Sequence, residues 1–134
     1  MKILFIDDEK KRNEFLVADL RQHFDLQIDW VRDVKSMLES LSNDYDAIIL
    51  DIMLPVDESF TIDEKKKSLN GLATGLVLIE RIRKIKEKIP ILVYSARGDI
   101  QEYISGQKYI TYLQKPKEPA VLMDELNTFI KKSK

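Results

Sequence analysis

Short apolar runs alternate with longer amphipathic segments along the whole of this 134-residue chain. The runs predict strands at residues 2–6, 27–31, 46–50, 91–94 and 109–113. Between them, apolar positions recur at helical spacing and predict helices near 9–23, after Asp33, at 76–87, after Asp99 and at 119–132. This alternation is typical of a parallel sheet with helices on both faces. We therefore predict a doubly wound α/β domain with five strands and five helices.

The apolar positions also predict which surfaces are buried. In the first helix the expected buried stripe consists of Phe15, Leu16, Ala18 and Leu20. In the third helix the same spacing selects Leu76, Ile79, Ile82 and Ile85. The second strand alternates Ile28 and Trp30 with polar residues, which is the pattern of a more exposed edge strand, and we assign Trp30 to packing.

Composition and charge exclude several classes of protein. An apolar content of 44% in this length supports one core, so we predict a single domain over residues 1–134. The 22 basic and 23 acidic residues create no field of one sign, so we expect neither a nucleic acid nor a membrane as partner. The absence of cysteine and of any ~20-residue apolar stretch favours a cytoplasmic protein.

Polar residues follow four of the expected strands, at the end of each strand. Asp7 and Asp8 follow the first strand, Asp51 the third, Ser95 the fourth and Lys115 the fifth. In a parallel sheet these ends share one rim, where open α/β sheets bind their ligands. Three carboxylates brought together repel one another unless a cation lies between them. Their hard oxygen ligands predict a Mg²⁺ site, with Mn²⁺ as an alternative.

This set of residues predicts phosphoryl transfer to a carboxylate. Asp51 stands alone and is the expected nucleophile, whereas the adjacent Asp7 and Asp8 can hold the metal together. Lys115 would bring a positive charge, and Ser95 a hydroxyl, to the phosphoryl oxygens. Taken singly, each residue has a simpler explanation, because acids cap helices, serines cap turns and lysines lie on surfaces. Only the placement of all these residues at strand ends distinguishes a phosphoryl-transfer site from caps and surface residues.

Four motifs together resemble the receiver domain of two-component response regulators. They are Phe5-Ile6-Asp7-Asp8-Glu9, Ile49-Leu50-Asp51-Ile52-Met53-Leu54-Pro55, Tyr94-Ser95-Ala96 and Tyr112-Leu113-Gln114-Lys115-Pro116. The resemblance covers nearly the whole chain. It implies a flavodoxin-like, five-stranded parallel sheet in the order 2-1-3-4-5. Because only two residues follow the last expected helix, the chain resembles a stand-alone receiver.

The resemblance also implies a signalling role. Asp51 would accept phosphate from the phosphohistidine of a sensor histidine kinase, in a two-component phosphorelay. Asp7, Asp8, Asp51 and the backbone carbonyl of Met53 would bind Mg²⁺, and Lys115 would contact the phosphoryl group. By the same resemblance, Ser95 and Tyr112 match the switch hydroxyl and the switch aromatic ring, and the Lys115-Pro116 bond matches one that is usually cis. The chain would be no enzyme beyond catalysing its own phosphorylation and dephosphorylation.

Phosphorylation would then shift the population towards an active surface. By the resemblance, that surface is formed by the fourth helix, the fifth strand and the fifth helix. Its expected members are Ile100, Tyr103, Ile104 and Lys117. It would bind a downstream protein partner or a second copy of this chain.

Two segments depart from the receiver pattern. Pro55 and the matching Gly75 are separated by residues 56–74, about fifteen more than a loop at that place requires. We interpret this insertion as a lid or docking element, or alternatively as a solvated excursion, with a turn at Asn70-Gly71. The segment 97–106 is short for the fourth helix, which would alter the output face, and Arg97 would lie with Met53 near the mouth of the site.

Two other functions stay open at this point. A receiver-shaped interaction module that is never phosphorylated would have the same strand pattern. A Mg²⁺-dependent phosphatase with an aspartate nucleophile is a further alternative. Such phosphatases employ a second acid two residues after the nucleophile, and Met53 stands there instead.

Overall fold

The computed structural model describes residues 1–69, 71 and 73–133. Its centre is a parallel sheet in the order β2-β1-β3-β4-β5. The strands are β1 (Lys2–Ile6), β2 (Gln27–Val31), β3 (Ala47–Leu50), β4 (Ile91–Ser95) and β5 (Ile110–Gln114). Because neighbouring strands all run in the same direction, their carboxyl ends share one rim. The predicted flavodoxin-like order is confirmed.

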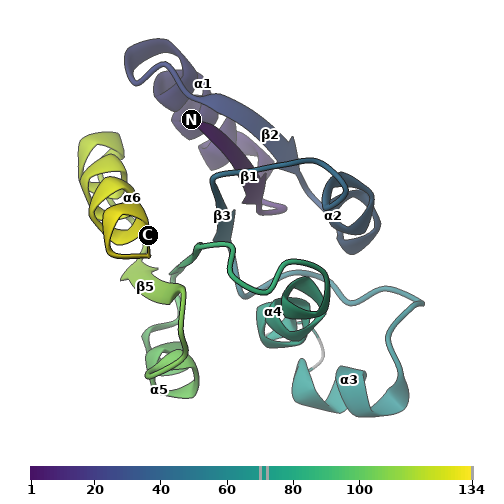
Figure 1. Cartoon of the computed structure of the whole chain (residues 1–134). Coiled ribbons are helices and arrows are strands. Elements are labelled where there is room, and N and C mark those ends of the chain that lie inside the picture. The colour runs from purple at the N-terminus through teal and green to yellow at the C-terminus, as the bar shows by residue number, and fades with distance from the viewer. Residues whose placement is uncertain (70, 72, 134) are drawn as a thin grey trace.

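Helices cover both faces of the sheet (Figure 1). On one face, α1 (Lys10–His23) and α6 (Pro119–Ser133) contribute to a common core. On the other face lie α2 (Val34–Ser40), α4 (Thr74–Ile85), the 3-10 turn η1 (Gly98–Ile100) and α5 (Gln101–Ile104). The described residues contain one α-helix more than the five predicted, namely α3 (Ile62–Lys67).

The central strands are buried on both faces, which explains their continuous apolar sequences. In β1, Ile3 and Phe5 enter the core beneath α1 and α6, whereas Leu4 and Ile6 enter the opposite core. All four side chains are fully buried. The outer strand β2 exposes its polar positions, as the alternating sequence predicted.

The buried side of α1 differs from the predicted stripe. Phe15 is 82% exposed and Ala18 is also exposed, so the prediction is wrong for these two residues. The buried residues are Asn13, Val17 and Leu20, which recur at spacings of four and three. An apolar pattern cannot select Asn13, because its side chain is polar. Its burial is possible because its amide donates to the Glu9 carbonyl across 2.6 Å. Helix α4 likewise exposes Ile85 at its last residue.

The insertion is a folded part of the domain and contains α3. Thr61 and Glu64 form a capping box at the start of this helix, with each side chain accepting from the other's backbone N–H. Phe60, just before the cap, is buried in the core. Figure 1 shows α3 beside α4, on the opposite side of the domain from α6. The predicted turn at Asn70-Gly71 lies partly outside the described residues.

Arg81 on α4 holds the insertion in place. Its guanidinium donates to both carboxylate oxygens of Glu64, across 3.0 and 3.1 Å. The same group lies 4.5 Å from the centre of the Phe60 ring and also donates to Ser59. For the described part of residues 56–74, the interpretation as a solvated excursion is therefore wrong, because a guanidinium fork and a buried ring attach this part to α4.

The segment after β4 is short, as the sequence predicted. It consists of η1 followed by one turn of α5. Ile100 and Ile104 are buried in the core beneath it, so their assignment to an exposed output surface is wrong. Ile100 and Ile104 are four positions apart and so lie on the same face of this turn, and burial of their apolar side chains turns that face towards the core. Tyr103, at 60% exposure, and Lys117 do lie on the surface.

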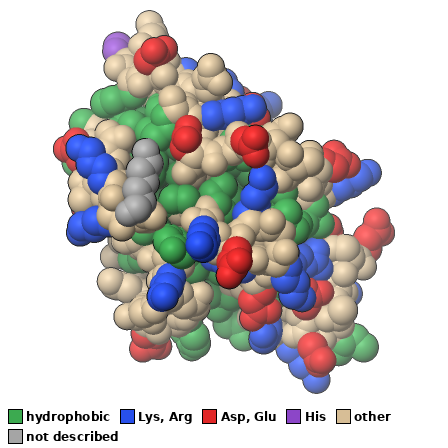
Figure 2. Space-filling model, viewed as in Figure 1, with side chains coloured by type: hydrophobic (Ala, Val, Ile, Leu, Met, Phe, Trp, Pro, Cys, Tyr) green, Lys and Arg blue, Asp and Glu red, His purple; other side chains and the backbone are tan. Residues whose placement is uncertain are grey.

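Charges of both signs are mixed over the surface. On the face seen in Figure 2, basic and acidic side chains are interspersed with hydrophobic ones. This distribution agrees with the net charge of −1. None of the described helices combines the length and apolar character needed to cross a bilayer.

Candidate functional site

Strand pairing brings the four predicted strand ends together. Ile6 of β1 pairs with Leu50 of β3, and the N–H of Asp51 donates to the Ile6 carbonyl across 2.9 Å. On the other side of β3, the N–H of Lys115 donates to the Ser95 carbonyl across 2.9 Å. The ladder thus continues beyond the strands and places their polar ends on one rim.

Asp7, Asp8 and Asp51 form an acidic cluster. Each offers a carboxylate oxygen, and these oxygens all lie within 4.8 Å of one another. Asp7 is 1% exposed and Asp51 8% exposed, while Asp8 is partly exposed. Three hard oxygen donors at this spacing, with one side open to water, fit Mg²⁺, which keeps several water ligands.

Lys115 reaches into this cluster from the end of β5. Its ammonium donates to the Asp7 carboxylate and lies 3.4 Å from Asp51 Oδ2. The Lys115 side chain is only 14% exposed. One cation therefore bridges the two most buried acids and offsets part of their mutual repulsion.

Burial and neighbouring charges act together on these groups. Burial raises the pKa of Asp51, Lys115 opposes this effect, and the Asp7 carboxylate adds to it. Burial, with the charge of Asp7, also raises the pKa of Asp8. Burial alone would lower the pKa of Lys115, but the carboxylates of Asp51 and Asp7 outweigh it and raise that pKa. The ionised acids are thus held at a cost that a bound cation would relieve.

The loops next to the acids are held by hydrogen bonds from backbone N–H groups. Asp7 accepts from the N–H of Glu9 across 3.0 Å, and Asp51 accepts from the N–H of Met53 across 3.2 Å. The loop after β3 is further held because the N–H of Gly75 donates to the Ile52 carbonyl across 2.8 Å. A Cβ atom at Gly75 would lie 2.7 Å from Ile52 Cα, so only glycine fits there.

The predicted switch residues lie at the edge of the same rim. Ser95 is fully buried, and its hydroxyl accepts from the N–H of Arg97 across 3.4 Å. The Tyr112 hydroxyl donates towards the backbone carbonyls of Arg97, across 2.9 Å, and Ser95, across 3.3 Å. Arg97 itself pairs with Asp99. Tyr112 is thereby tied to the backbone that carries Ser95.

Trp30 was assigned to packing by the sequence, and the structure gives it a second role. Its indole N–H donates to the backbone carbonyl of Asp7 across 2.9 Å. The contact spans the sheet edge from β2 to the loop after β1. No one-dimensional signal distinguishes this tryptophan from a packing residue, because its partner is a backbone atom on another strand.

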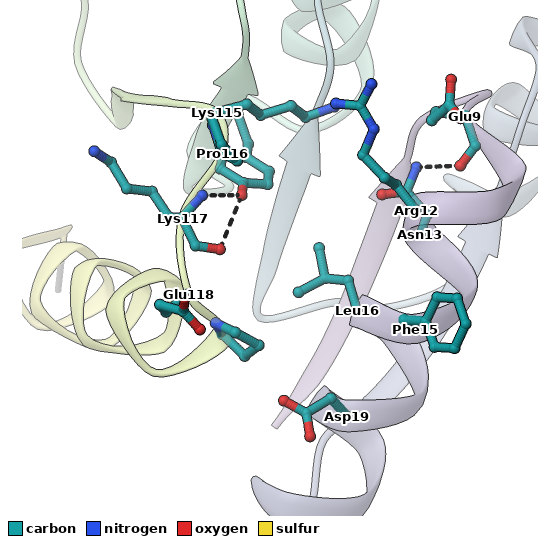
Figure 3. Close-up of a pocket in the computed structure, with 12 residues that line it drawn as sticks. Glu9, Arg12, Asn13, Phe15, Leu16, Asp19, Lys115, Pro116, Lys117 and Glu118 are labelled. Atoms are coloured by element: carbon teal, nitrogen blue, oxygen red, sulfur yellow. Dashed lines mark hydrogen bonds between the residues drawn. The ribbon is translucent and has the colours of Figure 1, made fainter.

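A pocket of about 520 Å³ adjoins the acidic site (Figure 3). Figure 3 shows Arg12 and Leu16 on α1 extending towards the loop that carries Lys115, Pro116 and Lys117. Tyr94 also lines the pocket. The Lys115-Pro116 bond is cis, as the resemblance implied. Lys115 thus lines this pocket and also contacts the carboxylates of Asp7 and Asp51.

Comparisons with known proteins agree with this geometry. The chain is 29% identical to the response regulator ArlR of Staphylococcus saprophyticus over 98% of its own length and 53% of the relative's. It is also 29% identical to the transcriptional regulatory protein CusR of Escherichia coli, over 98% of this chain and 52% of that protein. No protein-family model matches the chain.

A solved structure extends the likeness to the fold. The response regulator TrrA of Thermotoga maritima, in complex with Mg²⁺-BeF, superposes with a TM-score of 0.73 at 25% identity, covering 96% of this chain and 97% of that one. In sequence and in fold, the chain resembles the receiver domains of response regulators. This receiver spans about half the length of the curated relatives it matches. The predicted family and its place in two-component signal transduction are confirmed.

Proposed function

We propose that this receiver is a phosphorylation-controlled signalling domain with Asp51 as its phosphoacceptor. The observation that carries the proposal is the joint placement of Asp51, two further acids and Lys115 on one rim. In the response-regulator family, a phosphohistidine of a sensor histidine kinase is the expected donor. Because such a phosphohistidine is made from ATP, we propose the cytoplasm as the compartment.

Each residue has a defined part in the reaction. A carboxylate oxygen of Asp51 attacks the phosphorus atom, and the bond from phosphorus to the donor nitrogen breaks with its electron pair returning to the imidazole. Lys115 holds a positive charge 3.4 Å from Asp51, where charge develops on the phosphoryl oxygens. The hydrogen bond from Met53 N–H to Asp51 orients the attacking carboxylate.

We propose that Asp7, Asp8, Asp51 and the Met53 carbonyl hold the divalent ion. When bound, Mg²⁺ supplies positive charge that reduces repulsion between the carboxylate and the incoming phosphoryl group. The relative TrrA was solved with Mg²⁺-BeF, which supports Mg²⁺ as the cofactor here. Burial, together with the charge of Asp7, raises the pKa of Asp8 and of Asp51, so a bound cation would favour the ionised form of both acids.

Ser95 and Tyr112 form the proposed switch. The buried Ser95 hydroxyl would move onto the phosphoryl group, and Tyr112 would turn into the space left behind. In the present arrangement, the Tyr112 hydroxyl holds the backbone at Ser95 and Arg97. Through these bonds, a change at Ser95 would reach Tyr112 on β5.

The output surface is proposed to lie on α5, β5 and α6. Exposed Tyr103 and Lys117 are its described members, since Ile100 and Ile104 are buried. It would bind a downstream protein or a second copy of the chain. A lid or docking role for residues 56–74 stays a prediction, supported by the bond from Thr74 to the Leu54 carbonyl, one residue beyond Met53.

A small-molecule phosphodonor tests the proposed chemistry. With acetyl phosphate and excess Mg²⁺, we expect intact-mass spectrometry to show one phosphoryl adduct on the wild-type chain and none on Asp51→Asn. Asp44→Asn, which removes a fully exposed acid, is the matched control and should retain the adduct. An adduct that persists in Asp51→Asn would overturn the assignment. Absence of any adduct would support the unphosphorylated module, and turnover of phosphate esters would support the phosphatase.

A further inference from the structure

Tyr94 on β4 makes contacts that the proposed reaction does not yet explain. The residue is 4% exposed, and its ring packs in the core shared by α1 and α6. A buried phenol needs a partner for its hydroxyl. Here the hydroxyl accepts from the backbone N–H of Lys117 across 2.9 Å and donates to the carbonyl of the same residue at 3.4 Å. Figure 3 draws both bonds as dashed lines at Lys117.

The same ring also contacts the charged end of Lys115. The Lys115 ammonium lies 5.4 Å from the centre of the Tyr94 ring, within the range of a cation–π interaction. The backbone of Lys115 is held on the strand side by its hydrogen bond to the Ser95 carbonyl. Tyr94 therefore contacts the side chain of Lys115 and holds the backbone two residues further on, at Lys117.

Lys115 needs such support because of its own chemistry. A lysine stem is flexible, and holding it in one conformation costs side-chain entropy. Its ammonium must reach Asp7 and Asp51 at once, and a small displacement of the loop would move it away from one of them. The two carboxylates determine where the charge is favourable. The Tyr94 ring and hydroxyl restrict the conformations of the side chain and loop through which the Lys115 ammonium reaches the two carboxylates.

We propose that Tyr94 is a positioning residue for Lys115. Its ring makes a cation–π contact with the lysine ammonium, and its hydroxyl holds the loop after β5 through the backbone of Lys117. The consequence for phosphorylation rests on the proposed function of Asp51. The effect on Lys115 itself does not, and can be measured in the protein without a phosphodonor.

Two substitutions separate the ring from the hydroxyl. Tyr94→Phe keeps the ring and removes both hydrogen bonds, whereas Tyr94→Leu also removes the cation–π contact. Tyr45→Phe is a matched control at the opposite rim. There the Tyr45 hydroxyl donates to Asp29 across 2.6 Å, and the Lys2 ammonium lies 5.2 Å from the ring centre.

The first measurement follows the lysine directly. In protein labelled with ¹⁵N-lysine, the Lys115 ammonium signal, assigned with Lys115→Arg, should be resolved because the group is buried and hydrogen-bonded. We expect this signal to broaden in Tyr94→Phe and to merge with those of exposed lysines in Tyr94→Leu. Tyr45→Phe should leave it unchanged. Thermal unfolding of each variant establishes that the fold is intact.

The second measurement follows phosphorylation by acetyl phosphate. We expect the rate constant at saturating Mg²⁺ to fall about tenfold in Tyr94→Phe and further in Tyr94→Leu, since misplacement by about 1 Å has effects of this order or larger. The Mg²⁺ concentration at half-saturation should change less than about twofold, because the three acids remain in place.

The outcomes separate the positioning of Lys115 by Tyr94 from its effect on phosphorylation. An unchanged Lys115 signal in both folded Tyr94 variants would overturn the positioning role, whatever the kinetics. A changed signal with an unchanged phosphorylation rate would overturn its importance for the reaction. If the wild-type chain accepts no phosphate, the proposed function of Asp51 fails, while the ammonium signal still decides whether Tyr94 positions Lys115.

Discussion

The indole N–H of Trp30 donates to the backbone carbonyl of Asp7 across 2.9 Å, which connects the chain's single tryptophan to the acidic cluster. Metal binding at Asp7 should therefore change the environment of this indole. We expect titration with Mg²⁺ to produce a saturable change in tryptophan fluorescence.

Removing a ligand tests whether the fluorescence change reports this site. Asp8→Asn should weaken the apparent affinity for Mg²⁺ at least about tenfold, because a neutral amide replaces a charged oxygen ligand. Asp44→Asn should behave as wild type. An equal response in Asp8→Asn would place the metal elsewhere.

The acidic site should cost stability when no metal is present. Burial raises the pKa of Asp51 above its ordinary value of 3.8, so the ionised carboxylate is disfavoured in the folded chain at neutral pH. We expect Asp51→Asn to increase the free energy of unfolding by about 1 kcal/mol at pH 7 without Mg²⁺.

The pH dependence of this gain has a definite sign. The penalty is complete above the raised native pKa of Asp51 and disappears as the pH falls below 3.8, where both states bind the proton. Urea unfolding at pH 7 and pH 3.5 measures the difference. Excess Mg²⁺ at pH 7 should stabilise the wild type and reduce the advantage of Asp51→Asn. A destabilised Asp51→Asn at pH 7 would contradict this account.

The ion pair between Arg81 and Glu64 should stabilise the attachment of α3 to α4. The hydrogen bonds from Arg81 lower the pKa of Glu64 from 4.5 to about 2. Because the pair is partly exposed to water, we expect Glu64→Gln to lower the free energy of unfolding by about 1 kcal/mol at pH 7.

This contribution is present above pH 4.5 and is lost as the pH falls towards 2. The difference between wild type and Glu64→Gln in urea unfolding should accordingly shrink between pH 5 and pH 2.5. Glu80→Gln, which breaks the more exposed pair with Lys67, is the control and should have no measurable effect. Equal effects of the two substitutions would show that the Arg81 fork is not special.

Gly75 should tolerate no side chain. A Cβ atom there would lie 2.7 Å from Ile52 Cα and 3.1 Å from the Asp51 carbonyl oxygen. We expect Gly75→Ala to lower the free energy of unfolding by about 1–3 kcal/mol and to weaken Mg²⁺ binding, since the loop that carries Met53 must shift. Gly98→Ala is the control, because its nearest neighbour is the Gln114 side chain at 3.4 Å. Unchanged stability and metal affinity in Gly75→Ala would refute the tight fit.

The sequence by itself determined the elements and the local chemistry. The apolar runs in β1, β3 and β4 are continuous because those strands are buried on both faces, and their short length and polar ends identify them as strands. Asp7, Asp51, Ser95 and Lys115 follow strands that share one direction, so their convergence on one rim followed from the α/β alternation. Features that follow from the order and direction of the strands were therefore predictable from the sequence.

Tertiary structure decided the contacts between distant segments. The exposure of Phe15 and the burial of Asn13 depend on how α1 rests on the sheet, and hydrophobicity alone selected the wrong residues. Trp30 with Asp7, Tyr94 with Lys117, and Arg81 with Glu64 are pairs separated by 23, 23 and 17 positions. Hydrogen bonds and cation–π contacts need atoms a few ångströms apart, and no periodicity in the chain encodes that proximity.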